Sequence, residues 1–181
     1  MRRRWAIPLV FAVFGFGPSC GDPVHNAQVD ALGPETGGGP GPTHRAGQPC
    51  LTCHGGQGPA DVEFAVAGTV YQLPDAGAPG YEGVVVAVFD ATQDADGGTP
   101  KTARTNTVGN FYIRSADWSP VFPLHDVTLG VDGSQFQPVM KTRVGRDGSC
   151  GTCHFDPAGT GSPGHVYFAS EPGDLPGGGQ P

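Results

Sequence analysis

Four of the five cysteines form two pairs with the same short spacing, and a histidine follows each pair. The two segments are Cys50-Leu51-Thr52-Cys53-His54 and Cys150-Gly151-Thr152-Cys153-His154. Two thiols at this spacing can both reach the vinyl groups of one porphyrin as thioethers, and the adjacent imidazole then lies under the iron as an axial ligand. This C-x-x-C-H pattern is the signature of covalent haem attachment. The sequence therefore predicts two covalently bound haem c groups with their iron.

Two other uses of the cysteine pairs have to be weighed. Each pair alone is compatible with a disulfide, and the pairs together with the histidines have the residue types of a zinc site. Histidine makes up only 6 of the 181 residues, so one follows both pairs by chance with odds of roughly one in a thousand. An export signal, described below, also argues against a thiolate zinc site. The repeated histidine therefore favours haem.

On these two pentapeptides the chain resembles the multihaem cytochromes c. The resemblance covers ten residues and implies electron transfer between redox partners, not catalysis on a substrate. It implies thioether bonds at four positions, which are Cys50, Cys53, Cys150 and Cys153. It also implies that His54 and His154 are the proximal iron ligands.

The sixth iron ligands lie outside the motifs. His44 is the first choice, because it lies six residues before Cys50 in a polar loop where a histidine has no core to fill. His165, at the head of the last expected strand, is the second choice for a metal ligand. Three less favoured candidates are Met140, which suits a core position, His125 and His25. A second histidine lowers the reduction potential of the iron and a methionine raises it, whereas an open position would admit a small molecule.

The N-terminus has the features of an export signal. Three arginines, Arg2 to Arg4, precede a mainly apolar run at residues 5–17 that is too short to span a bilayer. Residues 1–19 are therefore predicted to be a signal peptide. Cys20 stands between small residues and resembles the lipidated cysteine of a bacterial lipobox, which implies a diacylglycerol anchor. The alternative is an ordinary signal peptide with an unmodified cysteine. We expect an exported protein in the periplasm or at the cell surface, anchored by lipid to a bacterial membrane.

The surplus of acidic residues in the chain limits the kinds of partner that it can bind. The leader contains three of the ten basic residues and none of the 17 acidic ones, so the mature chain has seven basic against 17 acidic residues. A chain this acidic does not bind nucleic acid through phosphates. The expected partners are other redox proteins, with a basic face if charge guides the encounter. Contact with the membrane is expected through the lipid alone.

The remaining chain divides by composition. Residues 20–43 lack apolar periodicity and predict a flexible, lipid-anchored tether, residues 44–61 form a first haem-binding segment, and the Gly/Pro-rich residues 172–181 predict a disordered tail. Residues 62–171 predict a β-sandwich that carries the second haem-binding segment at 150–154. About seven short strands are expected, at residues 62–73, 83–91, 101–106, 110–114, 127–132, 136–144 and 165–170. No segment has a convincing helical stripe.

The order of three strand segments resembles the carboxypeptidase-regulatory or transthyretin-like (prealbumin-like) domains. The segments are Gly68-Thr69-Val70-Tyr71, Gly83-Val84-Val85-Val86-Ala87-Val88 and Thr105-Asn106-Thr107-Val108-Gly109-Asn110-Phe111. The resemblance covers roughly residues 62–170. It implies an all-β, seven-stranded antiparallel sandwich with two haem-bearing loop segments, and says little about function.

The resulting hypothesis is an exported dihaem c-type electron carrier, and two alternatives stay open. One is a haem enzyme with an open axial site that reduces a peroxide or a nitrogen oxide. The other is a β-sandwich that binds a peptide or glycan, with the haems as accessories. No constellation of nucleophile, base and orienting group is visible, so no catalytic residue is assigned. If both motif loops emerge at one end of the sandwich, the two haems lie close together, which is the architecture we expect.

Overall fold

The computed structural model describes residues 22–35, 39–93, 98–131, 137–138, 140 and 142–168, with only the backbone at 137–138. Its helices are α1 (Pro23–Ala31), α2 (Leu51–His54) and the 3-10 helix η1 (Cys150–Thr152). Its strands are β1 (Phe64–Thr69), β2 (Val85–Phe89), β3 (Lys101–Arg104), β4 (Asn110–Arg114), β5 (His125–Gly130) and β6 (Gln137–Pro138). The predicted leader, Cys20 and the tail at 172–181 lie outside the described residues.

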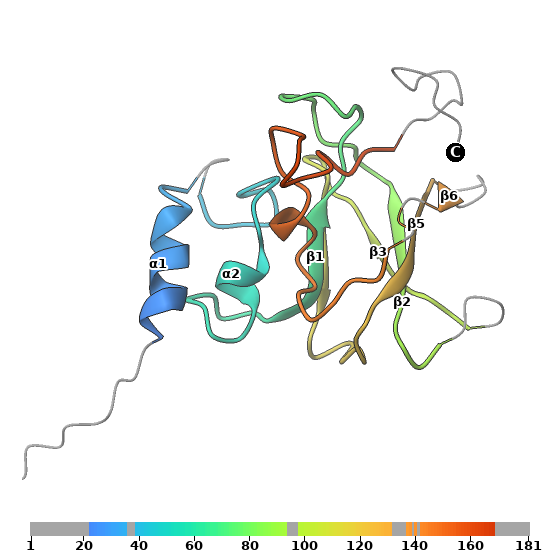
Figure 1. Ribbon diagram of the computed structural model, residues 1–181, viewed down its shortest axis with the longest axis horizontal. Coiled ribbons are helices and arrows are strands. Elements are labelled where there is room, and N and C mark those ends of the chain that lie inside the picture. Colours follow the sequence, from blue (N-terminus) through green and yellow to red (C-terminus); the bar gives the residue numbers. More distant parts are fainter. Residues whose placement is uncertain are drawn as a thin grey trace, which may run out of the picture.

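The strands form two antiparallel sheets (Figure 1). One sheet pairs β1 with β4, and the other has the order β3-β2-β5-β6. The all-β class is therefore confirmed. The number of strands differs from the seven expected, because the described residues contain five strands of four to six residues and one of only two.

The segment expected to form the last strand makes one bridge in place of a strand. Tyr167 pairs in parallel with Tyr71, the Tyr71 N–H donates to the Val166 carbonyl (2.8 Å), and the Phe168 N–H donates to the Tyr71 carbonyl (3.0 Å). The partner at Tyr71 lies beyond the end of β1, so no continuous ladder is available. Residues 169–170 of the expected strand lie outside the described residues.

Apolar alternation builds the core as the sequence predicts. On β4 the side chains of Phe111 and Ile113 are buried, whereas Tyr112 and Arg114 are exposed. Strand β2 lies between β3 and β5, and its last four residues are buried, as expected for a central strand covered on both faces. Strands β1 and β4 form the separate two-stranded sheet, and β1 contacts both motif segments.

Strand β1 positions both cysteine motifs. Helix α2 and helix η1 each pack against it, as Figure 1 shows. The Gly47 N–H, just before the first motif, donates to Oγ1 of Thr69 at 2.8 Å. The Ala67 N–H donates to the carbonyl of Gly148, just before the second motif, at 3.0 Å. Strand β1 thus forms a hydrogen bond with the segment that precedes each motif.

Helix α1 lies in the segment where the sequence predicted a tether without regular structure. Its formation depends on its first turn and not on an apolar stripe, since Oδ1 of Asp22 accepts from the Val24 N–H (2.9 Å) and Pro23 occupies the first turn. Arg45 fastens the end of the helix to the first motif segment by donating to the carbonyls of Leu32 (3.3 Å) and Gly33 (2.8 Å). Within the described ranges, no helix has the length and apolarity needed to cross a bilayer.

Candidate functional site

The two C-x-x-C-H segments adopt the same backbone conformation. In the first, the N–H groups of Cys53 and His54 both donate to the Cys50 carbonyl, at 3.1 and 2.9 Å. In the second, Cys153 and His154 donate to the Cys150 carbonyl at 3.2 and 2.9 Å. Each motif is therefore one helical turn. Positions three and four apart share a helix face, so the two cysteines and the histidine of each motif belong to one side of the turn.

Both motif histidines are held in the same way at Nδ1. His54 Nδ1 lies 2.7 Å from the Val62 carbonyl oxygen, and His154 Nδ1 lies 2.9 Å from the Gly164 carbonyl oxygen. A carbonyl only accepts, so Nδ1 carries the proton and Nε2 of the neutral ring presents a lone pair. Neither Nε2 makes a hydrogen bond to any described residue. This orientation by a carbonyl is the arrangement typical of a metal-ligating histidine.

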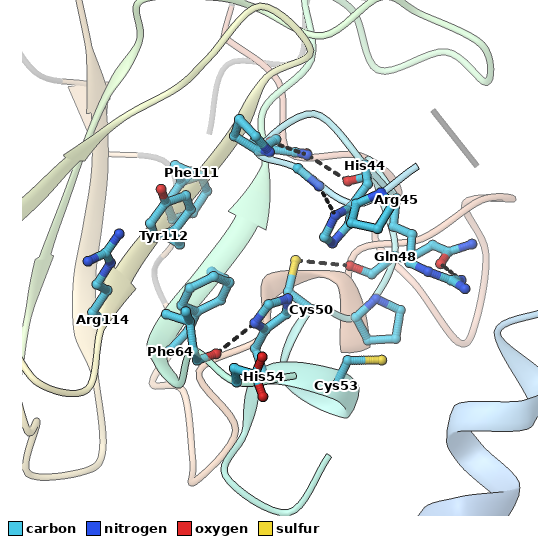
Figure 2. Close-up of a pocket in the computed structure, with 18 of the residues that line it drawn as sticks. His44, Arg45, Gln48, Cys50, Cys53, His54, Phe64, Phe111, Tyr112 and Arg114 are labelled. Atoms are coloured by element: carbon cyan, nitrogen blue, oxygen red, sulfur yellow. Dashed lines mark hydrogen bonds between the residues drawn. The ribbon is translucent and has the colours of Figure 1, made fainter. Parts of the chain in front are cut away.

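The first motif opens onto a cavity of about 410 Å³ between α2, the loop before it and the edge of β1 and β4 (Figure 2). The His54 ring stacks on Phe64, with centroids 4.1 Å apart, and Phe64 stacks on Tyr112 at 4.5 Å. Together with the carbonyl contact, this stack fixes the plane of the His54 ring. The Cys50 thiol lies in the same cavity and donates to the Gln48 carbonyl at 3.5 Å.

His44, the first choice of the sequence analysis for a sixth iron ligand, lines this cavity. Its ring centroid lies 5.9 Å from that of His54 with an interplanar angle of 14°, and Figure 2 shows both rings bordering the space beside the Cys50 sulfur. The backbone carbonyl of His44 accepts from Nδ2 of Asn110 at 2.9 Å. A residue of β4 thus holds the loop that carries His44.

The second motif opens onto a cavity of about 480 Å³ that reaches into the core. Besides Cys150, Cys153 and His154, Met140 lines this cavity. Much of the remaining wall consists of aliphatic and aromatic side chains, namely Val66, Val86, Val88, Phe111, Leu124, Val127, Leu129, Val144 and Val166. The second cavity is therefore the more apolar of the two in its lining, and a thioether sulfur is present in it.

The other three histidines line neither cavity. Nε2 of His165 pairs with Oδ2 of Asp156 at 2.8 Å, and its ring stacks on Tyr71 at 3.8 Å. His125 has both ring nitrogens engaged, with the Asp126 carboxylate at 2.6 Å and the Asp90 carbonyl at 2.8 Å. His25 lies in α1 with a buried Nε2 that has no hydrogen-bond partner among the described residues. Of the two preferred distal candidates, the structure therefore brings His44 to a motif cavity and not His165.

The two motifs pack directly against each other. A β-carbon on Gly151, the buried second residue of the second motif, would lie 2.7 Å from the Gln48 carbonyl oxygen and 3.1 Å from the Pro49 nitrogen. Glycine is required there because the backbone of the first motif segment occupies the position of a side chain. The two motifs, far apart in the sequence, thus share one end of the protein.

The cysteines at the head of each motif are partly buried. Burial is the main cause that raises the pKa of Cys50 to about 11 and that of Cys150 to about 12. Both groups are therefore protonated at neutral pH. All four motif cysteines are free thiols. Across the described ranges, no three histidine, cysteine or acidic side chains are grouped so as to hold a metal ion by themselves.

Arginines gather at the two cavities although the chain is acidic. Arg45 and Arg114 line the first cavity, and Arg143 and Arg146 line the second. These are four of the seven basic residues that follow the leader. Guanidinium groups bind carboxylates and phosphates through paired hydrogen bonds. Each cavity thus has two guanidinium groups in its lining against one carboxylate, that of Asp61 in the first and of Asp147 in the second.

Several of these features were missed by sequence reasoning. The carbonyls of Val62 and Gly164 carry no side-chain signal, and the ring stack on Phe64 depends on pairing between distant strands. The arginines did leave a signal, because Arg45 precedes Cys50 by five residues and Arg146 precedes Cys150 by four. Comparison of the chain with protein-family models, with curated proteins and with solved structures found no match.

Proposed function

We propose that this chain is an exported dihaem c-type electron carrier, with one haem attached through Cys50 and Cys53 and the other through Cys150 and Cys153. The observation that carries the proposal is the doubled orientation of the motif histidines. Two separate helical turns each present an imidazole whose Nδ1 is held by a backbone carbonyl at 2.7 or 2.9 Å. That is the tautomer an iron ligand needs.

The lining of the cavities supports a haem ligand. A porphyrin has a wide apolar face and two carboxylate side chains, so its site needs apolar walls together with cations. Stacked aromatic rings and core aliphatic side chains supply the walls, and two arginines per cavity supply the cations. The cavity volumes lie in the range of small-molecule and cofactor sites.

Each group of side chains has a distinct role in this proposal. Haem, when bound, supplies an iron that exchanges one electron at a time. His54 and His154 bind and orient that iron, and the cysteines prevent loss of the cofactor. Gly151 allows the two attachment segments to meet. This contact supports the expected architecture, in which the two haems lie near each other and electrons pass between them.

Location and partners follow from the sequence. Residues 1–19 would direct export, and Cys20 would take the lipid anchor that holds the protein at a bacterial membrane. The surplus of acidic residues supports redox partners with a basic face. For the fold, we propose the transthyretin-like arrangement on the strand order that the sequence resembles. The antiparallel pairing and the central position of β2 support it.

Haem stoichiometry tests the function. The full chain is matured in a bacterial host that attaches haem covalently, and haem per chain is measured by the pyridine haemochrome method. We expect two haems for the natural chain and one each for Cys50→Ala/Cys53→Ala and Cys150→Ala/Cys153→Ala. Reductive titration should then take up one electron per haem. A chain without haem would overturn the proposal, and a ferric spectrum that shifts strongly with cyanide would favour the haem-enzyme alternative.

A further inference from the structure

We infer that the two sites have different sixth ligands, the His44 imidazole in the first cavity and the Met140 thioether in the second. This inference rests on the proposed haem function and deepens it. It predicts that one chain carries a low-potential site and a high-potential site side by side, because histidine lowers and methionine raises the reduction potential of haem iron.

The distance between the two histidine rings in the first cavity is compatible with two imidazoles on one iron. Two rings that coordinate a metal from opposite sides have centroids ~6 Å apart, since each metal–nitrogen bond is ~2 Å. The centroids of His44 and His54 are 5.9 Å apart with nearly parallel planes. Backbone contacts hold both residues, because Val62 accepts from the His54 ring and Asn110 donates to the His44 carbonyl.

One proton has to move for His44 to act as a ligand, and the structure provides its acceptor. The Gly41 N–H donates to His44 Nδ1 at 3.1 Å, which leaves the ring proton of the neutral imidazole on Nε2. Coordination through Nε2 would place that proton on Nδ1 and would break the hydrogen bond from the Gly41 N–H. Oε1 of Glu35 lies 3.4 Å from Nδ1 and is the carboxylate that would accept it. Glu35 is therefore a positioning residue for the His44 ligand.

In the second cavity, Met140 is the candidate with suitable chemistry. Among the described lining residues, the histidine is His154 itself, which already serves as the proximal ligand. The Asp147 carboxylate, also in the lining, accepts from the Ser149 N–H at 2.8 Å and so supports the turn before the motif. Met140 offers a soft, uncharged sulfur that suits haem iron in an apolar cavity.

The competing histidines line neither cavity. Nε2 of His165 is paired with Asp156, and its buried Nδ1 has no hydrogen-bond partner among the described residues. Both ring nitrogens of His125 are engaged, Nδ1 with the Asp126 carboxylate and Nε2 with the Asp90 carbonyl. The apolar wall of the second cavity would also raise the reduction potential, as Met140 would, because a low-dielectric site favours the less charged ferrous state.

Spectroscopy of single-site variants tests this assignment. Met140 is the one methionine that remains after the leader, so a methionine signature can come only from it. The Cys50→Ala/Cys53→Ala variant keeps only the second haem. In its ferric state we expect the charge-transfer band of iron–methionine coordination at the red end of the spectrum. In its reduced state we expect a strongly upfield-shifted methionine methyl resonance. With Cys150→Ala/Cys153→Ala, we expect two-histidine spectra and the lower potential.

Three substitutions separate the possible outcomes. Met140→Leu conserves volume and should abolish the methionine signature and lower the second-site potential, whereas His125→Gln should change neither site. Glu35→Gln should weaken the two-histidine spectrum of the first site. Two haems per chain with equal potentials and no methionine signature would overturn the inference and leave the proposed function intact. A chain without haem would overturn the proposed function itself.

Discussion

The α-carbon of Gly151 faces the carbonyl oxygen of Gln48 so closely that a β-carbon would lie 2.7 Å from that oxygen. The two segments that carry the C-x-x-C-H motifs therefore meet through backbone. This contact sets the distance between the sites, and it leaves no room for even the smallest side chain.

Replacing Gly151 with alanine should force the two motifs apart. We expect a loss of about 1–3 kcal/mol in the free energy of unfolding, as for overpacking of a filled interior. Denaturant unfolding of the full chain measures the loss. Gly159→Ala is the matched control, because a β-carbon there meets nothing within 4 Å. Equal stability of the two variants would contradict the direct contact.

Replacing Asn110 with alanine should loosen the loop that holds His44. Asn110 donates to the His44 carbonyl at 2.9 Å and accepts from Oγ1 of Thr69 at 2.8 Å. Losing such part-buried hydrogen bonds costs about 1–3 kcal/mol of stability. In the variant that keeps only the first haem, the two-histidine spectrum should also weaken. Gln72→Ala, which removes one long hydrogen bond at 3.4 Å, should leave both quantities unchanged.

The haem-free chain should lose stability in alkali. Cys50 and Cys150 have folded-state pKa values of about 11 and about 12, above the ordinary value of 9.0. The stability they contribute is fully present below pH 9 and is lost as the pH rises toward 11 and 12, because the unfolded thiols ionise first. Unfolding free energies measured from pH 7 to 11 should therefore fall.

Two comparisons isolate the thiols as the cause. Cys50→Ala/Cys150→Ala should flatten most of the alkaline loss, and a smaller loss should remain because burial also raises the pKa of Tyr71. The haem-loaded chain should lack the thiol contribution, since a thioether has no proton to release. An unchanged alkaline loss in the double variant would show that the thiols are not its source.

The arginines of the second cavity should raise the reduction potential of that site. Arg143 and Arg146 line the cavity, and positive charge nearby favours the ferrous state over the more highly charged ferric state. Arg143→Gln/Arg146→Gln should shift the second-site potential downward by tens of millivolts, and the shift should shrink at high salt. Lys101→Gln, outside both cavities, provides the control. A potential that does not move would contradict contact between these arginines and the cofactor.

Sequence patterns predicted the parts of this protein whose signal lies in side-chain order. Strand β4 occupies residues 110–114 as predicted, because its alternation leaves no other register that buries Phe111 and Ile113. Helix α1 was missed because Asp22 and Pro23 start it without an apolar stripe. The last expected strand was wrong in extent, since its partner at Tyr71 lies beyond the end of β1.

The candidate site also contains some features that the sequence predicts and others that depend on the fold. The motif residues are visible in the sequence because spacing defines them, and His44 is visible because it lies in a polar loop shortly before the first motif. The carbonyl partners of the two motif histidines are backbone groups, and any residue type supplies a carbonyl. His165 lies close to the second motif in sequence, but the nearby Asp156 takes its ring nitrogen. Such a pairing depends on the fold of the loop after the motif, which spacing alone does not specify.

Covalent attachment of haem is the claim on which the account depends most, and intact-mass spectrometry tests it directly. The chain is matured in a host that attaches haem to C-x-x-C-H segments, and the Cys→Ala variant of all four motif cysteines is the control. The account predicts a coloured protein whose mass exceeds that of the control by two haem groups, after correction for the four substitutions. A colourless protein with the mass of the bare polypeptide would contradict it.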